Sequence, residues 1–421
     1  MGEHSLKSKN GVNIYVYKNP TVHGFYISLF VRSGSMYEGS EEQGITHFLE
    51  HSLIRNVNRV YGGKLYSALD RLGLEFNAST YSEMVQFYIS GAVEHFASGA
   101  EIITKIFEPI LLDKSEIDAE RRRVKAEIRE GDEKTSLAYF TAGKVFEGTP
   151  LCASILGTAK TVNAINGTTL EAYRKRIFSR ENVFFYVTGN VSEGDISYLC
   201  DMIDRYTLTG TVCNENIAPV PANFLQRDGA VHIKNADYTM LRFTFDMDMS
   251  RISMAESDLL YDMLLSGYNS RLFIEMSELR GMIYDIGGSC ERYRNIGTLS
   301  FYFEVKGKDI YSAVELVTDI LGSLKREENV SPVKAGHVDN AYLLYDDIRE
   351  LNFTFAYDNH VMCQSYASVE ERRARYAGVT NARLAELARE IFTPRGLTLT
   401  AKGQKKSIDE EKIKSIIRRL S

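Results

Sequence analysis

The sequence predicts an α+β protein made of two similar domains, and three observations support that prediction. The chain has 421 residues, more than one hydrophobic core usually supports. Segments typical of strands and of helices alternate along both halves. Part of the first half is then echoed in the second half at a constant distance. Two domains of about 200 residues each agree with the usual size of a domain.

The first half alternates between strand and helix patterns. Tyr26–Val31 is typical of a strand, and the Gly- and Ser-containing segment after it is typical of a loop. Ser115–Asp118 has the form of a capping box and predicts the start of a helix. In chain order we expect a strand at 26–31, a loop at 33–40, helices at 42–54 and 64–72, strand material at 75–90, an amphipathic helix at 94–112, a helix at 115–130 and a β-rich segment at 183–190.

The echo joins residues 64–79 to residues 271–286 at a constant offset of 207. In each half the echoed segment leads into a strand and then into an amphipathic helix. The strands are expected at 86–89 and 300–303, and the helices at 97–107 and 310–321. The shared order favours two related domains. The alternative is the same alternation of helix and strand without common ancestry.

The domain boundary is expected where this regular patterning weakens. We predict one domain at 1–210 and a second at 229–421, joined by a linker at 211–228 that contains Pro219 and Pro221. The last residues, 407–421, place Ile and Leu at helical spacing and predict a docking helix.

Composition disfavours several classes of function. The net charge of −6, from 50 basic and 56 acidic residues, gives no reason to expect a nucleic-acid partner. Five scattered cysteines without a C-x-x-C pair argue against a disulfide framework and against a thiolate zinc site. No apolar stretch is long enough to span a bilayer, and the N-terminal segment lacks the apolar core of a signal peptide. We therefore expect a cytoplasmic protein with no membrane partner.

The segment His47-Phe48-Leu49-Glu50-His51 is the strongest sign of chemistry. On a helix, residues four apart project from one face, so His47 and His51 can bind one metal ion, with Glu50 on the adjacent turn. This H-x-x-E-H pattern is the inverzincin signature. A lone pair of histidines on a helix is more often structural. A catalytic zinc site also needs a third protein ligand and an open position for water.

The helix expected at 115–130 supplies independent support. A single stripe along it holds Ile117, Glu120, Val124, Glu127 and Ile128, while basic residues occupy the other faces. Two carboxylates thus lie on the face that should be apolar. A buried carboxylate without a partner costs several kcal/mol at least, so each requires a cation or hydrogen-bond donors. The alternative is a shallower stripe whose glutamates reach solvent.

At this point the sequence resembles a known family. The segments Arg32–Ser35 and Glu41–His51 are similar to the pitrilysin family, in the branch of mitochondrial processing peptidase and its bacterial relatives. In that family a glutamate 76 residues beyond the second histidine completes the zinc site, which is Glu127 here, and another glutamate lies seven residues earlier, which is Glu120. The resemblance implies two domains, each with a mostly antiparallel sheet and helices packed on one face.

The resemblance also implies a role for each site residue. His47, His51 and Glu127 are expected to bind Zn²⁺, and Glu50 to act as the general base. Glu120 is expected to orient a ligand histidine. The edge strand that would bind the peptide main chain contains Asn77, Ala78, Ser79 and Thr80, for which ordinary sheet structure is an equal alternative. Tyr284 is expected to help hold the substrate carbonyl.

One position departs from the family pattern. Members that act as a single chain carry an arginine seven residues before the tyrosine, and this sequence has Ser277 there. Arg280 or Arg271 can substitute, or a related partner chain can supply the complete Arg/Tyr pair. We therefore expect a homodimer, or a heterodimer with a related subunit.

Two functions remain open at this stage. The first is a zinc metalloendopeptidase that hydrolyses peptides or unfolded segments. The second is a non-catalytic binding or assembly subunit that retains the peptidase fold. The sequence favours the enzyme, because subunits without activity usually lack zinc ligands, and here His47, His51 and Glu127 are all present.

Overall fold

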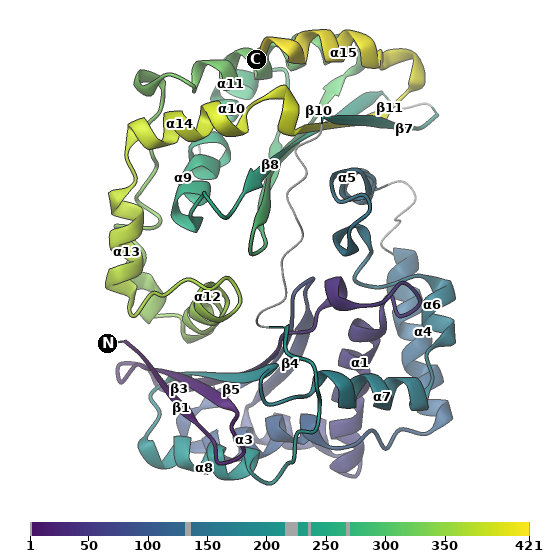
Figure 1. Cartoon of the computed structure of the whole chain (residues 1–421), viewed down its shortest axis with the longest axis vertical. Coiled ribbons are helices and arrows are strands. Elements are labelled where there is room, and N and C mark those ends of the chain that lie inside the picture. The colour runs from purple at the N-terminus through teal and green to yellow at the C-terminus, as the bar shows by residue number, and fades with distance from the viewer. Residues whose placement is uncertain (1, 131–135, 215–225, 235–236, 267–269, 421) are drawn as a thin grey trace. The chain divides into compact units, whose positions relative to one another are not determined.

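The protein is described from a computed structural model that covers residues 2–130, 136–214, 226–234, 237–266 and 270–420 (Figure 1). The chain forms two compact units, each built from three segments. Unit 1 contains Met1–Asp132, Ala153–Ala218 and Tyr342–Glu371, and unit 2 contains Glu133–Cys152, Pro219–Ala341 and Arg372–Ser421. Each unit therefore takes one segment from the other half of the sequence.

The predicted domain division stays a prediction. Most of the predicted linker, 211–228, lies outside the described residues. The compact units have their main parts on either side of it, but 133–152 and 342–371 pack with the opposite half. Contiguous domains at 1–210 and 229–421 therefore differ from the packing by these two segments.

Unit 1 is built on a sheet of six strands in the order β1-β2-β6-β3-β5-β4. The strands are β1 (Glu3–Lys7), β2 (Asn13–Lys18), β3 (Gly24–Val31), β4 (Glu75–Thr80), β5 (Val85–Ala92) and β6 (Val183–Gly189). Among the described strands of this sheet, only β2 and β6 pair in parallel. The helices are α1 (Ile45–Val60), α2 (Leu65–Leu72), α3 (Phe96–Thr104), α4 (Lys114–Glu130), α6 (Ala159–Ala164), α7 (Gly167–Ile177) and α8 (Glu193–Ile203). Alternate residues of β3, such as Ile27 and Leu29, join the same core as the apolar residues of α1 and α3.

The opposite face of this sheet is covered by α12 (Ile348–His360), which comes from the second half of the chain (Figure 1). Asn352 is fully buried there, accepts a hydrogen bond from Ser28 Oγ at 2.7 Å and donates to the carbonyl of Tyr186 at 3.0 Å. Thr188 Oγ1 donates to the carbonyl of Ile348 at 2.7 Å. The polar residues of this face are thus paired with a helix distant in sequence.

Unit 2 is built on a sheet of five strands in the order β7-β11-β8-β10-β9. The strands are β7 (Arg227–His232), β8 (Tyr238–Asp248), β9 (Ile286–Arg292), β10 (Ile296–Lys306) and β11 (Leu397–Gly403). The helices are α9 (Met254–Leu265), α10 (Arg271–Phe273), which continues into a π-helix at Ile274–Glu278, α11 (Ile310–Ser323), α13 (Val369–Gly378), which starts at the end of unit 1, α14 (Asn381–Ile391) and α15 (Glu410–Ile417). In the part of this sheet that the structure describes, only β7 and β11 pair in parallel.

The second face of this sheet carries α5 (Leu137–Val145), which comes from the first half. The hydroxyls of Thr141 and Thr400 lie 2.6 Å apart. Gly229 leaves room for the Phe140 ring, because a Cβ there would lie 2.9 Å from it. The predicted fold class is confirmed. The single helix on the second face of each sheet is an addition that the sequence did not reveal.

Three local features complete the fold. The capping box predicted at Ser115–Asp118 is wrong by two residues, because Asp113 accepts hydrogen bonds from the backbone amides of Ser115 and Glu116, and Glu116 accepts from Asp113 N at 3.0 Å. The five cysteines are free thiols. Within the described ranges, no helix has both the length and the hydropathy that a membrane span requires.

Candidate metal centre

Helix α1 is fixed at its beginning by a buried carboxylate. Glu38 accepts hydrogen bonds from the backbone amides of Gly44 at 2.7 Å and Thr46 at 2.8 Å. These amides belong to the first turn, which has no intrahelical acceptor for them. Gly44 adopts a φ of 85°, and a Cβ there would approach the carbonyl of Leu156 at 2.6 Å. Burial raises the pKa of Glu38 to about 7 despite these bonds.

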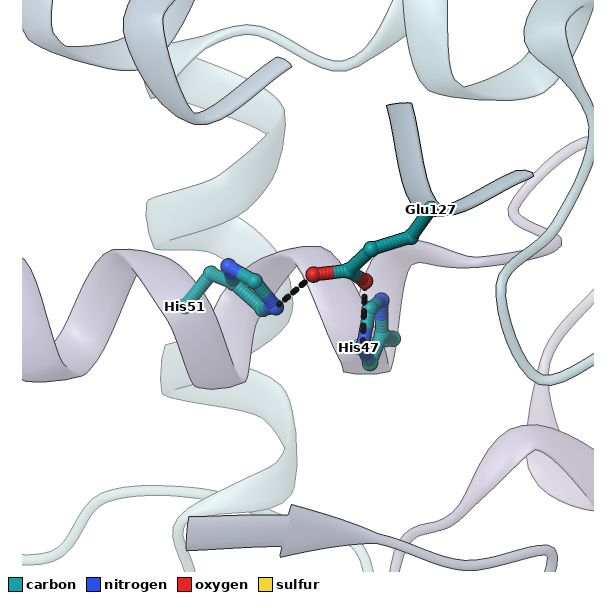
Figure 2. Close-up of side chains that lie close together, drawn as sticks. All are labelled: His47, His51 and Glu127. Atoms are coloured by element: carbon teal, nitrogen blue, oxygen red, sulfur yellow. Dashed lines mark ion pairs between the residues drawn. The ribbon is translucent and has the colours of Figure 1, made fainter. Parts of the chain in front are cut away.

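Figure 2 shows the three side chains that converge beside α1. His47 Nε2 lies 3.5 Å from Glu127 Oε2, and His51 Nε2 lies 3.5 Å from Glu127 Oε1. One ligand atom from each residue can be chosen so that all lie within 4.8 Å of one another. Ligands about 2.0–2.2 Å from a tetrahedral zinc ion lie roughly 3.3–3.6 Å apart. Two imidazole nitrogens and a carboxylate are also the donors that zinc prefers, so these residues fit the ion.

The two histidines differ in their protonation. Burial, and then the neighbouring His51, lowers the pKa of His47 to about 4. Burial alone would lower the pKa of His51 too, but its hydrogen bond to Glu120 and the nearby carboxylates outweigh burial and raise it. A histidine binds a metal only when it is neutral. His47 is therefore ready to bind at neutral pH, whereas His51 must release a proton more often.

Glu120 and Glu127 lie at different depths on α4. The Glu120 side chain is 1% exposed, and its Oε2 lies 3.4 Å from His51 Nδ1. Its other oxygen accepts from Arg55 and, at 3.3 Å, from Arg123. The hydrogen bonds from His51 and Arg55 overcome burial and lower the pKa of Glu120. Glu127 is 40% exposed, so the buried stripe is deep at Glu120 and shallower toward the end of the helix.

Glu50 lies on α1, the helix that carries both histidines, and its side chain is held by a residue at the edge of the sheet. Its Oε2 accepts a hydrogen bond of 2.6 Å from Thr80 Oγ1, at the end of β4. Burial raises the pKa of Glu50, and the Thr80 bond and the neighbouring His51 partly oppose that shift. A carboxylate close to His51 and Glu127, two of the three residues that fit the ion, is suited to accept a proton from a water molecule.

Comparison with known proteins identifies the family. Residues 14–159 match the profile described as insulinase (peptidase family M16), and residues 164–336 match the one described as the peptidase M16 inactive domain. The chain belongs to peptidase family M16. This confirms the predicted resemblance to the insulinase/pitrilysin family.

Relatives cover nearly the whole chain. It is 24% identical over 395 residues to "Uncharacterized zinc protease YmxG" of Bacillus subtilis, covering 91% of this chain and 94% of the relative. Among solved structures, a protease from Helicobacter pylori superposes with a TM-score of 0.83 at 16% identity, covering 95% of this chain and 99% of that one. Subunit 1 of the mitochondrial cytochrome b-c1 complex of Caenorhabditis elegans is 24% identical over 217 residues, covering 51% of this chain and 44% of the subunit. The structural likeness shows the fold alone.

The two M16 profiles together span the motif and the residues predicted to touch substrate in both units. β4 is the outermost strand of its sheet, and Asn77 on it is exposed. Tyr284 belongs to unit 2, follows the π-helix and is 96% exposed. Ser277 lies inside that π-helix, and Arg280 donates to the Glu275 carboxylate at 2.6 Å. The Nε atom of Arg271 is buried without an acceptor among the described residues.

Sequence reasoning missed two residues at this site, Arg55 and Glu38, and one contact of a third residue, Thr80. Arg55 lies four residues after His51, so its bond to Glu120 could have been found from helical spacing. Glu38 carries no signal in the sequence, because its role depends on how the preceding loop folds back. Thr80 was predicted to bind substrate, which stays a prediction, and no signal in the sequence indicated that its hydroxyl contacts Glu50.

Proposed function

We propose that this chain is a zinc metalloendopeptidase that hydrolyses peptides or unfolded protein segments. The observation that carries the proposal is the convergence of His47, His51 and Glu127, with ligand atoms within 4.8 Å, beside Glu50. The names of the M16 relatives as zinc proteases support the choice of metal.

Each residue has a role in this proposal. His47, His51 and Glu127 hold the ion, which supplies a Lewis acid that activates a water molecule and polarises the scissile carbonyl. Glu50 accepts the proton of the attacking water and returns it to the leaving amine. Glu120 accepts a hydrogen bond from His51 Nδ1. The Nε2 atom of His51 therefore carries the lone pair that would bind the metal ion.

The substrate is proposed to bind along β4 as an added strand. β4 pairs only with β5 among the described strands, so its other edge offers main-chain donors and acceptors around Asn77, Ala78 and Ser79. Main-chain pairing tolerates many sequences. This supports peptides and unfolded segments as the substrate class.

A second chain is proposed to complete the Arg/Tyr pair that would hold the substrate carbonyl. Arg280 is committed to Glu275, through both the carboxylate and the backbone carbonyl, and Ser277 has no positive charge to offer. Tyr284 then lacks an arginine partner of the family type, which a related subunit of a homodimer or heterodimer can supply. The Ser277→Arg variant tests this directly: kcat should rise in the isolated protein, and unchanged kcat would contradict the role given to that position.

The alternative is a non-catalytic binding or assembly subunit, favoured by Ser277 and by the similarity to a cytochrome b-c1 subunit. The Glu50→Gln variant separates the two functions. We expect peptide hydrolysis to fall by roughly 100-fold or more, since general acid–base catalysis contributes about 10²–10⁴-fold. Zinc content should remain that of the wild type. Equal hydrolysis by both proteins would reject the mechanism, and a wild type that binds zinc but cleaves no peptide would favour the subunit.

A further inference from the structure

The hydroxyl of Thr80 has an unusual place on the edge strand. Phe76 and Ala78 of β4 pack against the apolar core, and Thr80 continues the same face because side chains alternate along a strand. A third apolar side chain would suit that face. Instead, Thr80 Oγ1 donates a hydrogen bond of 2.6 Å to Glu50 Oε2 on α1.

This bond is the only one that Glu50 receives from a residue the structure describes. The flexible Glu50 side chain carries three rotatable bonds, and one fixed oxygen restricts all of them. Oε2 is occupied by the threonine, so Oε1 is the oxygen left to meet a water molecule. One hydroxyl therefore decides which way the carboxylate points.

We infer that Thr80 is a positioning residue that orients Glu50 for proton transfer and links it to the peptide-binding strand. The inference rests on the proposed function, in which Glu50 is the general base. Thr80 acts through its side chain on Glu50, while the substrate meets the main chain of β4. A peptide that pairs with β4 would thus fix the position of Thr80, and Thr80 in turn orients Glu50.

Turnover by Thr80→Val tests the role in catalysis, because valine keeps the shape and removes the donor. A misplacement of about 1 Å can cost roughly 100-fold in rate, so we expect kcat to fall roughly tenfold or more while KM stays within about twofold. Thr80→Ser keeps the hydroxyl and should recover most of kcat. Thr354→Val is the matched control, because Thr354 donates to Glu350 at 3.2 Å on α12, far along the chain from the motif. It should leave both constants unchanged.

Two readouts do not depend on turnover. In the inactive Glu50→Gln background, adding Thr80→Val should change the Kd for an uncleaved substrate peptide by less than about twofold, with equal zinc content. In thermal unfolding of the metal-free protein, Thr80→Val and Glu50→Ala should lower the midpoint non-additively, because they remove the same bond.

The outcomes separate the inference from the proposed function. A wild-type kcat in Thr80→Val, or additive midpoint shifts, overturns the positioning role. A raised Kd with unchanged kcat shows that Thr80 contacts substrate. If the wild-type protein cleaves no peptide, the proposed function fails, and the unfolding cycle still decides whether Thr80 holds Glu50.

Discussion

The helix beside the outermost strand has a different electrostatic character in each unit. In unit 1, α1 lies against edge strand β4, and in unit 2, α9 lies against edge strand β9. The three residues that converge beside α1 have no arginine or lysine partner among the described residues: the Nδ1 atom of His47 has no partner there, and Glu127 of α4 forms ion pairs there only with the two histidines.

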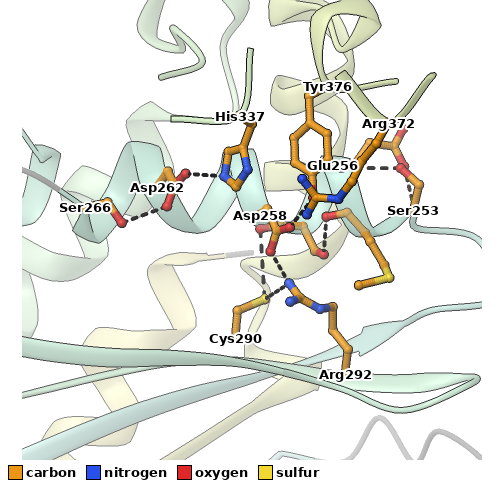
Figure 3. Close-up of polar contacts among 12 residues, drawn as sticks. Ser253, Glu256, Asp258, Asp262, Ser266, Cys290, Arg292, His337, Arg372 and Tyr376 are labelled. Atoms are coloured by element: carbon orange, nitrogen blue, oxygen red, sulfur yellow. Dashed lines mark hydrogen bonds and ion pairs between the residues drawn. The ribbon is translucent and has the colours of Figure 1, made fainter. Parts of the chain in front are cut away.

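On α9 the carboxylates already have protein partners, as Figure 3 shows. Asp258 pairs with Arg292 of β9 and accepts a hydrogen bond of 2.6 Å from the Tyr376 hydroxyl. Asp262 contacts His337 Nε2 at 2.9 Å and Ser266 Oγ at 2.7 Å. Burial raises the pKa of the nearby Cys290 thiol to about 11.

This difference indicates that the presence or absence of a protein cation decides whether such a cluster can bind a metal ion. Both units place carboxylates or imidazoles at a helix next to an edge strand. Where the protein supplies arginine, as around Asp258, the charges cancel and the cluster serves packing. Where it leaves His47, His51 and Glu127 without such a cation, an external cation can complete the cluster. This agrees with the description of the second family domain as inactive.

The largest expected effect comes from removing the negative charge of Glu127, the carboxylate among the three proposed zinc ligands. Glu127→Gln keeps the shape and removes the charge, so zinc affinity should fall by more than the roughly 10–100-fold that loss of an outer partner costs. Competition with a chromogenic chelator measures it. Glu130→Gln, three residues further along the same helix, is the control and should bind zinc normally. If Glu127→Gln bound zinc as tightly as the wild type, the difference drawn between the residues beside α1 and those on α9 would be contradicted.

The matching change in unit 2 should affect stability instead of metal. Arg292→Met removes the ion pair between Arg292 and Asp258, and breaking a buried pair of this kind costs about 3 kcal/mol. The free energy of unfolding in urea measures this loss. Zinc content should be unchanged. A variant that unfolds like the wild type would show that the cluster around Asp258 does not depend on its arginine.

A smaller effect is expected from substituting Arg55, which donates to Glu120 beside the proposed zinc ligands. Arg55→Met removes the main donor to Glu120 and lets that carboxylate turn away from His51, so zinc affinity should fall roughly tenfold. Arg123→Met is the matched control, because Arg123 contacts the same oxygen but is 65% exposed. It should have little effect. Equal losses in both variants would mean that charge alone, without orientation, supports His51.

The pH dependence should follow the raised pKa of His51. Zinc must displace the proton of His51, so affinity should decline about tenfold per pH unit as the pH falls below that pKa, which lies above 6.5. The lowered pKa of His47 adds a second proton only near pH 4. In the metal-free protein the sign for stability is opposite. The folded state binds the His51 proton more tightly than the unfolded state, so this contribution is full below pH 6.5 and is lost as the pH rises through the folded pKa. Zinc titrations and urea unfolding at several pH values measure both trends.

The parts of the site that the sequence predicted depend on local spacing. His47 and His51 share a face because both lie on one helix, and Glu127 lies on the stripe of a second helix, where the family resemblance distinguishes it from Glu120. The depth of Glu120 and the exposure of Glu127 depend on how α4 lies against α1, and one helix alone does not encode that. Likewise, Ser28 and Thr188 indicate a polar face on β3 and β6, but not that a helix from residues 348–360 will cover it.

Each sheet is covered on one face by a helix from the other half of the chain, and this sets an order of events during synthesis. Every residue proposed to bind zinc has been translated by Glu127, yet α12 begins at Ile348, 221 residues later. At about 5–20 residues per second, that interval is on the order of 10–45 seconds on the ribosome. Until then the face of the first sheet that contains Tyr26, Phe30 and Tyr186 has no cover. The nascent first half is therefore an expected client for chaperones, and it reaches its final form only when the second half has been made.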